Sequence, residues 1–166
     1  SLRQINNIFN TIKIKNIKRT RDGVVRSIVV KNFLCHKYLK VDFEKSIKFI
    51  VGGNGSGKSA ILDALILGLG GKAYHTHRYS QIKSYIKNGE EFASIEIKIK
   101  NDGPKAYKYN EYGKYITIIR DITDTGDSSY KVKSASGREI YFLRKSENCL
   151  LLSAILVETL FQHHFF

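Results

Sequence analysis

Residues 49–65 read FIVGGNGSGKSAILDAL, and this stretch decides the fold class. An apolar run leads into a glycine-rich turn, and apolar residues at three- and four-residue spacing follow it. Glycines let successive backbone N–H groups turn inward around an anion without Cβ clashes. The start of a helix adds its own free N–H groups and the positive end of its dipole. The order of strand, loop and helix therefore predicts an α/β protein with a phosphate-binding loop.

The loop matches the P-loop pattern G-x-x-x-x-G-K-[ST]. Lys58 is expected to reach the β- and γ-phosphates of a nucleotide, and Ser59 to offer its hydroxyl to Mg²⁺. Asn54 and Ser56 would complete the loop through backbone contacts. The predicted nucleotide-binding residues are Gly52, Gly53, Asn54, Gly55, Ser56, Gly57, Lys58 and Ser59, with Ser59 also as the magnesium ligand.

Hydrolysis needs more than this loop, because a P-loop ATPase also uses an acid at the end of an apolar strand and a residue that activates water. Asp121 follows an apolar run, but Arg120 intervenes. Glu158 lacks a preceding aspartate, and Asp42 and Glu44 fit surface positions on a short amphipathic strand. We therefore assign no catalytic residue and expect the chain alone to hold a nucleotide with little turnover.

Strand patterns surround the loop. Residues 24–34 and 39–44 predict a hairpin, since both are rich in β-branched and aromatic side chains. Residues 46–52 are apolar on both faces at their end, which predicts a central buried strand. The helix that begins near Gly57 is expected to end at the glycines of residues 68–71.

The second half of the chain alternates between apolar and polar residues. Residues 72–80 predict a loop, and residues 81–89 a short helix stopped by Asn-Gly. An antiparallel meander is then predicted from three runs, at 92–100, 112–122 and 130–137.

The net charge of +13, with a pI near 9.7, favours a polyanionic partner, because neutralising phosphates releases their counterions. A solvated lysine-rich surface is the plainer alternative. Residues 1–40 hold ten Lys or Arg against one acid, Asp22. This basic lead-in fits an arm that contacts DNA or carries a nuclear address, and it fits a solvated tail equally well. DNA is the predicted partner.

The cysteines and the apolar runs indicate the cellular environment in which the protein is expected. Cys35 and Cys149 form no disulfide framework, so free thiols in a reducing compartment are expected. The longest apolar run, residues 149–161, is shorter than the roughly 18–20 residues that cross a bilayer. We expect a soluble protein without a membrane partner.

Two further clusters are weaker candidates. His75 with His77, or His163 with His164, could bind a metal, but no third ligand stands at a suitable spacing. Tyrosines interleaved with lysines could stack on single-stranded nucleic acid, although cross-strand packing in a meander is the favoured interpretation. These tyrosines are Tyr107, Tyr109, Tyr112 and Tyr115.

With these features in place, the chain resembles the N-terminal head segment of the structural maintenance of chromosomes (SMC) family, most closely its sixth eukaryotic paralogue group. The likeness is carried by residues 27–43, 49–73, 78–101 and 129–137. The run FLCH before the loop and the run GLGGKA at the end of the helix are specific to that group.

The resemblance implies the N-terminal lobe of an ABC-type ATPase head, a P-loop NTPase with a mixed and antiparallel sheet. It further implies ATP and Mg²⁺ as cofactors, a role in DNA repair and recombination, a partner SMC head with complex subunits, and a nuclear, chromosome-associated location. Arg78 occupies the place of an arginine that is thought to sense DNA and ATP in this family.

The likeness stops after Gly137. The family pattern continues to a strand ending in a magnesium-contacting glutamine, whereas this chain ends ENCLLLSAILVETLFQHHFF, and Gln162 is not assigned that role. We expect three segments: a basic arm (1–23), a P-loop head lobe (24–145) and a divergent apolar tail (146–166).

Two other functions remain open from the sequence. A non-catalytic DNA-binding or regulatory fragment would bind DNA without using the P-loop. A self-contained P-loop nucleotide kinase or small GTPase would need guanine-reading or lid residues downstream, and the meander has neither an NKxD run nor an arginine-rich lid.

Overall fold

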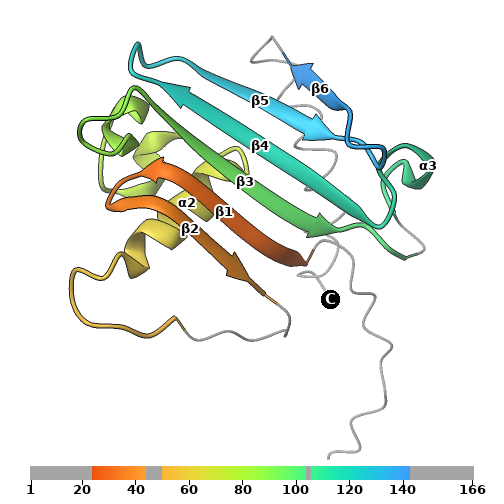
Figure 1. The fold of residues 1–166 in the computed structure, drawn as a ribbon, viewed down its shortest axis with the longest axis horizontal. Coiled ribbons are helices and arrows are strands. Elements are labelled where there is room, and N and C mark those ends of the chain that lie inside the picture. Colours follow the sequence, from red (N-terminus) through yellow and green to blue (C-terminus); the bar gives the residue numbers. More distant parts are fainter. Residues whose placement is uncertain (1–23, 44–49, 104–105, 143–166) are drawn as a thin grey trace, which may run out of the picture.

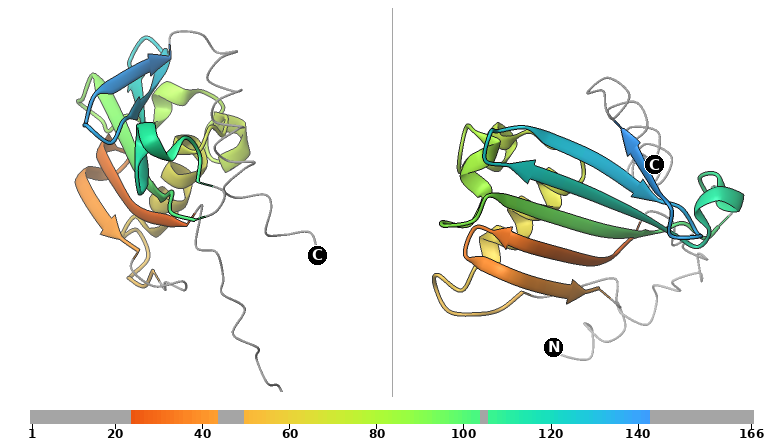
Figure 2. Two further views of the ribbon diagram at one scale, coloured as in Figure 1. Left: turned by 90° about the vertical axis from the view of Figure 1, so that its right-hand side faces the viewer. Right: turned by 45° about the horizontal axis from the view of Figure 1, so that its top comes forward.

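A computed structural model of the chain describes residues 24–43, 50–103 and 106–142; the expected arm (1–23) and tail (146–166) lie outside these ranges. Six strands form one sheet, with helix α2 and two short 3₁₀ helices on one side of it (Figures 1 and 2). The strands are β1 (Val25–Phe33), β2 (His36–Asp42), β3 (Phe92–Lys100), β4 (Tyr115–Thr123), β5 (Ser128–Lys133) and β6 (Glu139–Phe142). The helices are α2 (Lys58–Gly68), η1 (Ala73–Thr76), η2 (Ile82–Tyr85) and α3 (Tyr109–Tyr112).

The sheet order is β2-β1-β3-β4-β5-β6, and every neighbouring pair is antiparallel. The predicted hairpin is β1–β2, and the predicted meander is β3–β4–β5 with β6 as an additional strand. Both predictions are confirmed. Among the described strands the sheet is therefore antiparallel, without the parallel pairs that a mixed sheet would add.

The predicted central strand over residues 46–52 is wrong where the structure describes it. Residues 50–52 belong to no strand, and residues 46–49 lie outside the described ranges. Ile50 is 42% exposed and Val51 is 86% exposed. A strand needs a hydrogen-bonding neighbour, and no strand in the described part of the chain pairs with residues 50–52.

The core lies between α2 and the sheet. Strand β3 alternates strictly, so that one set of its side chains faces α2 and the other faces solvent. Gly68 on α2 allows close packing, because a Cβ there would lie 2.5 Å from Ile97 Cδ1. The buried residues of this layer include Ile28, Val30, Ala60, Ile61, Ala64, Leu67, Ala93, Ile95, Ile97 and Ile99.

Helix α2 ends at the predicted glycines. The Gly71 N–H donates to the Ile66 carbonyl at 2.9 Å, and Gly70 adopts a left-handed φ of 95°. This is the hydrogen-bonding pattern of a Schellman cap, which closes the helix on its own last turn.

The segment between α2 and β3 is anchored against β1. The predicted loop contains η1, and the predicted short helix is η2, followed by a bridge between Phe33 and Ile86. Tyr85 is fully buried, stacks on Phe33 at 5.7 Å between ring centroids and shares a hydrogen bond with Thr76. These contacts hold residues 78–88 beside the β1–β2 turn.

Of the four tyrosines at positions 107–115, Tyr107 and Tyr112 pack on each other outside the strands, so their contact is not the cross-strand packing that the sequence favoured. Tyr112 is buried and stacks on Tyr107 at 5.8 Å, and burial raises the pKa of Tyr112 to about 12. Tyr109 and Tyr115 remain exposed. Within the described ranges, no helix is long and apolar enough to cross a membrane.

Candidate nucleotide site

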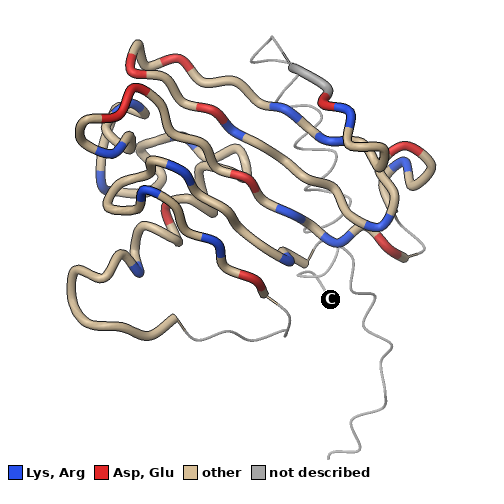
Figure 3. The backbone as a smooth tube through the Cα atoms, in the orientation of Figure 1, with Lys and Arg blue, Asp and Glu red and all other residues tan. Residues whose placement is uncertain are grey.

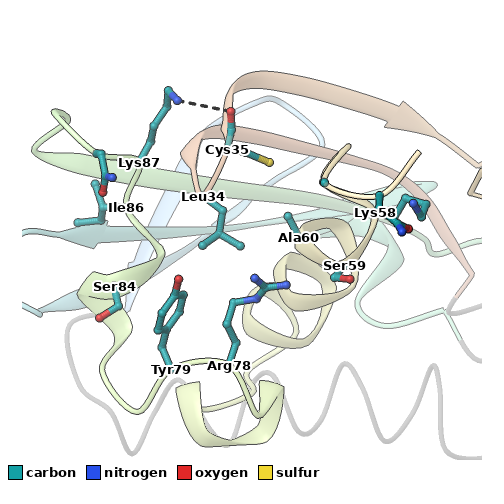
Figure 4. A pocket seen from close by; sticks show the side chains of 14 residues that line it. Leu34, Cys35, Lys58, Ser59, Ala60, Arg78, Tyr79, Ser84, Ile86 and Lys87 are labelled. Carbon is teal, nitrogen blue, oxygen red and sulfur yellow. Dashed lines mark hydrogen bonds between the residues drawn. The ribbon is translucent and has the colours of Figure 1, made fainter. Parts of the chain in front are cut away.

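A pocket of about 620 Å³ lies where three segments meet. These are the β1–β2 turn, the P-loop with the start of α2, and residues 78–88 (Figure 4). Lys87 Nζ donates to the Cys35 carbonyl at 3.5 Å and joins two of the three segments across the rim. The lining residues are Leu34, Cys35, Asn54, Gly55, Gly57, Lys58, Ser59, Ala60, Arg78, Tyr79, Ser84, Ile86, Lys87 and Asn88.

The loop has a conformation that requires glycine. Gly57 has a φ of 87°, in the left-handed region that L side chains rarely adopt. A Cβ at Gly57 would also lie 2.2 Å from His36 Nε2 and 2.8 Å from Cys35 Sγ. The second glycine of the pattern is therefore needed both for its backbone angle and for the close approach of the β1–β2 turn.

The N-terminal end of α2 is left open toward the pocket. The helix begins at Lys58, and its N-cap residue is Gly57, which has no side chain that could cap the first N–H groups. The Ala60 N–H donates to the Gly57 carbonyl at 3.1 Å. The first helical turn contains no acidic residue. The first N–H groups of a helix have no partner within the helix, so this end presents backbone donors and a positive dipole to an anion.

Lys58 lies over the loop. Its Nζ donates to the carbonyls of Gly52 and Gly53, both at 2.7 Å. Of the predicted nucleotide-binding residues, Asn54, Gly55, Gly57, Lys58 and Ser59 line the pocket. The other predicted residues, Gly52, Gly53 and Ser56, shape the loop instead: the Ser56 N–H donates to the Gly53 carbonyl at 3.3 Å.

Arg78 also lines the pocket, from the side opposite the loop, and its side chain is directed toward the start of α2 (Figure 4). Its Nε donates to Asp63 Oδ2 at 2.7 Å. Asp63 lies on α2, and its side chain is 7% exposed against 39% for that of Arg78. The hydrogen bond to Asp63 raises the pKa of Arg78 above its ordinary value.

The sequence analysis missed several residues of this site. Asp63 carried one detectable signal, since it is an acid in a helix whose other residues after Ser59 are apolar. Tyr79, Lys87 and Asn88 carried none, because the bridge between Phe33 and Ile86 brings them to the loop.

Among the described residues, the alternative acids Asp42 and Asp121 and the histidines His75 and His77 do not line the pocket. Asp121 pairs with Lys131 at 2.7 Å and Asp42 with Lys40 at 3.4 Å, and neither acid lines the pocket. The described residues contain no group of three or more His, Cys, Asp or Glu that could hold a metal. His163, His164, Glu44 and Glu158 lie outside these residues.

The model of the family described as "AAA domain" (AAA_23) matches residues 27–160, including much of the expected divergent tail. The chain belongs to this family.

Within it, the chain matches SMC proteins. The human "Structural maintenance of chromosomes protein 6" is 45% identical over 131 residues, which are 78% of this chain and 12% of that protein. The protein of the same name from Schizosaccharomyces pombe is 43% identical over 136 residues, 81% of this chain and 12% of its own length. The chain thus spans only about an eighth of the length of these relatives, and the resemblance to the sixth SMC paralogue group is confirmed.

Solved structures show the same fold. A structure described as "Structural biochemistry of ATP-driven dimerization and DNA stimulated activation of SMC ATPases" is 29% identical, with a TM-score of 0.65 over 80% of this chain and 79% of that chain. A second, "Crystal structure of the SmcHead bound to the C-winged helix domain of ScpA", has a TM-score of 0.66 over 80% of this chain and 40% of that one. The fold is that of the N-terminal lobe of an SMC-type ATPase head.

Proposed function

We propose that this chain is the ATP-binding N-terminal head segment of an SMC-type chromosome-maintenance and DNA repair ATPase. One observation carries the proposal: Lys58 and an uncapped helix end face a pocket formed by a P-loop of glycine-dependent geometry. Backbone N–H donors, a lysine and a helix dipole fit a triphosphate, which is an anion of high charge density.

The residues take separate roles in this proposal. Lys58 exchanges the carbonyls of Gly52 and Gly53 for β- and γ-phosphate oxygens, and the loop N–H groups hold the phosphate chain. Ser59 lines the pocket and supplies its hydroxyl to Mg²⁺. Arg78 contacts the nucleotide and responds to DNA, as its place in the SMC pattern implies.

The same pocket favours binding over turnover. No carboxylate stands among its described lining residues, so neither a second magnesium ligand nor a water-activating acid is at hand. We propose that these groups come from the rest of a complete head and from a partner SMC head, together with complex subunits at nuclear chromosomes. The solved SMC ATPases described by "ATP-driven dimerization" are consistent with such completion.

Mg-ATP titration of the full chain tests the proposal, with anisotropy of a fluorescent ATP analogue as the measurement. Lys58→Ala is expected to weaken binding by about 10- to 100-fold, because it removes charge-assisted hydrogen bonds to phosphate. Lys83→Ala is the matched control, since Lys83 is exposed on η2 and does not line the pocket. Equal affinities for Lys58→Ala and the wild type would overturn the proposal, and steady-state hydrolysis abolished by Lys58→Ala would overturn the prediction of low turnover.

DNA is the second proposed partner, and a groove of about 720 Å³ on the face of the sheet opposite α2 supports it. Basic residues recur along β1, β2 and β3 (Figure 3). Tyr38 and Tyr115 are exposed in the groove, and Lys98 Nζ lies 5.5 Å from the centroid of the Tyr115 ring. Cations beside exposed aromatic rings suit a phosphate backbone with bases that can stack. The charged residues of the groove are Arg26, Lys31, Lys40 and Lys98 against Asp42 and Glu96.

Oligonucleotide binding at several salt concentrations tests this second proposal. Lys31→Glu with Lys98→Glu is expected to weaken binding and to flatten its salt dependence, whereas the control Lys83→Glu keeps the wild-type slope. An unchanged slope in the double variant would exclude the groove. Salt-sensitive DNA binding that ignores both Mg-ATP and Lys58→Ala would favour the non-catalytic DNA-binding fragment.

A further inference from the structure

We propose that Asp63 is a positioning residue, which holds Arg78 by its Nε so that the two terminal nitrogens of the guanidinium meet a phosphate group of the bound nucleotide. The inference rests on the proposed nucleotide site and assigns it a residue outside the P-loop pattern. Asp63 contacts Arg78 and does not line the pocket itself, so any effect of Asp63 on the ligand passes through Arg78.

The burial of Asp63 is the first step. Its residue exposure is only 5%, on a helix whose other residues after Ser59 are apolar. A carboxylate removed from water is costly unless it is paired and hydrogen-bonded. In the described part of the chain, its ion-pair partner is Arg78.

The second step is the way in which Arg78 is held. Nε makes the bond to Asp63, and the Tyr79 side chain next to it in sequence also interacts with the Arg78 guanidinium. Arg78 lines the pocket, whereas Asp63 does not. A guanidinium carries five N–H donors in a fixed planar fork. Once Nε is fixed, the four N–H groups of the terminal nitrogens keep a defined direction, and this fork matches the oxygens of a phosphate.

The third step is the location of the anchor. Ser59 and Asp63 stand four residues apart on α2, so they lie on neighbouring turns of one helix face, separated by about 6 Å along the axis. The proposed magnesium ligand and the anchor of Arg78 therefore belong to one rigid element. Arg78 reaches across the pocket toward this part of α2, as Figure 4 shows.

A purely structural clamp between α2 and the segment that follows η1 is the competing explanation. Because the Asp63 carboxylate is buried and loses its partner in Arg78→Gln, some loss of stability is expected under either explanation. A clamp would affect thermal stability and leave nucleotide affinity unchanged, whereas a positioning residue affects affinity only while Arg78 is present.

A double-mutant cycle on the full chain separates the two explanations. Asp63→Asn keeps the shape of the side chain, and Arg78→Gln removes the cation. Each single variant is expected to weaken Mg-ATP binding, by about threefold and about tenfold respectively, and the double variant to bind no worse than Arg78→Gln. Asp121→Asn is the matched control, since it removes a carboxylate paired with a lysine outside the pocket. Independent losses that multiply in the double variant, or no loss in Asp63→Asn, would overturn the inference.

A measurement on the wild type covers the case in which Asp63→Asn fails to fold. Nitrogen-15 NMR of the Arg78 side chain is expected to show an Nε–H signal that persists when Mg-ATP is added, while the terminal N–H signals shift. Loss of the Nε–H protection, or unchanged terminal signals at saturating Mg-ATP, would overturn the inference. If the wild type binds no Mg-ATP at all, the proposed function fails instead, so the two failures are distinguishable.

Discussion

The two ends of helix α2 differ in how their backbone groups are hydrogen-bonded. At the C-terminal end, Gly71 closes the last turn, and Arg120 Nη1 donates to the carbonyls of Leu67 and Gly71, both at 2.8 Å. Tyr130 adds a second donor to the Leu67 carbonyl at 3.0 Å. At the N-terminal end, the Gly57 cap makes no side-chain hydrogen bond, and the pocket lies in front of it.

The difference shows which end of α2 has backbone groups available to bind a ligand. Every α-helix leaves about four N–H groups and four carbonyls without partners inside the helix. The protein satisfies carbonyls at one end with its own side chains and leaves the other end for a ligand. Both ends have an arginine, but Arg120 is 8% exposed and bonds to the helix itself, whereas Arg78 is more exposed and faces the pocket.

The largest expected effect on stability comes from removing the side-chain contacts at the C-terminal end of α2. Arg120→Ala removes the donor that bridges Leu67 and Gly71 and leaves a cavity, so we expect a loss of about 3–4 kcal/mol in the free energy of unfolding. Nucleotide affinity per folded molecule should stay unchanged. Urea unfolding of the full chain measures the first quantity and ATP titration the second.

Burial lowers the pKa of Arg120, which means that desolvation of this cation opposes part of what its hydrogen bonds contribute. Arg120→Met separates these effects, because methionine retains much of the volume without the donors or the charge. A stability equal to that of the wild type in Arg120→Met would show that desolvation of the cation offsets all that its carbonyl contacts contribute, and it would break the comparison between the two ends.

The second largest effect is expected at the N-terminal end of α2, next to the pocket. Gly57→Ala forces a Cβ into a left-handed position against His36 and Cys35, and we expect a loss of about 1–3 kcal/mol together with loss of Mg-ATP binding. Gly53→Ala is the control inside the same loop, since a Cβ there meets nothing within 4 Å. Gly89→Ala isolates the backbone strain, because Gly89 has a φ of 85° and open space around it.

Gly57→Ala that binds Mg-ATP as tightly as Gly53→Ala would show that the loop geometry at the helix start is not what the nucleotide requires. Calorimetric titration of both variants under the same conditions decides between these outcomes.

The open end of α2 could be predicted from the sequence, and the closed end only in part. The loop pattern is local, since Gly57, Lys58 and Ser59 are consecutive and the helix periodicity follows at once. The contacts of Arg120 and the bond from Arg78 to Asp63 join residues 15 to 53 positions apart, and no local pattern encodes them. The strand predicted over residues 46–52 is wrong for another reason in its described part, residues 50–52: apolar character predicts that a segment is buried, and it does not supply a neighbouring strand.

The smallest effect tests how completely the closed end is satisfied. Tyr130→Phe removes one of the two side-chain donors to the Leu67 carbonyl, while Arg120 and the Gly70 N–H keep that carbonyl bonded, so a loss of only about 0.5–1 kcal/mol is expected. In the Arg120→Ala background the same change leaves the carbonyl with the Gly70 N–H at 3.3 Å and neither side-chain donor, so its cost should rise. Urea unfolding of the four proteins measures the coupling. Purely additive losses would mean that the two donors act independently, and that the C-terminal end of α2 is less fully closed by its neighbours than its geometry indicates.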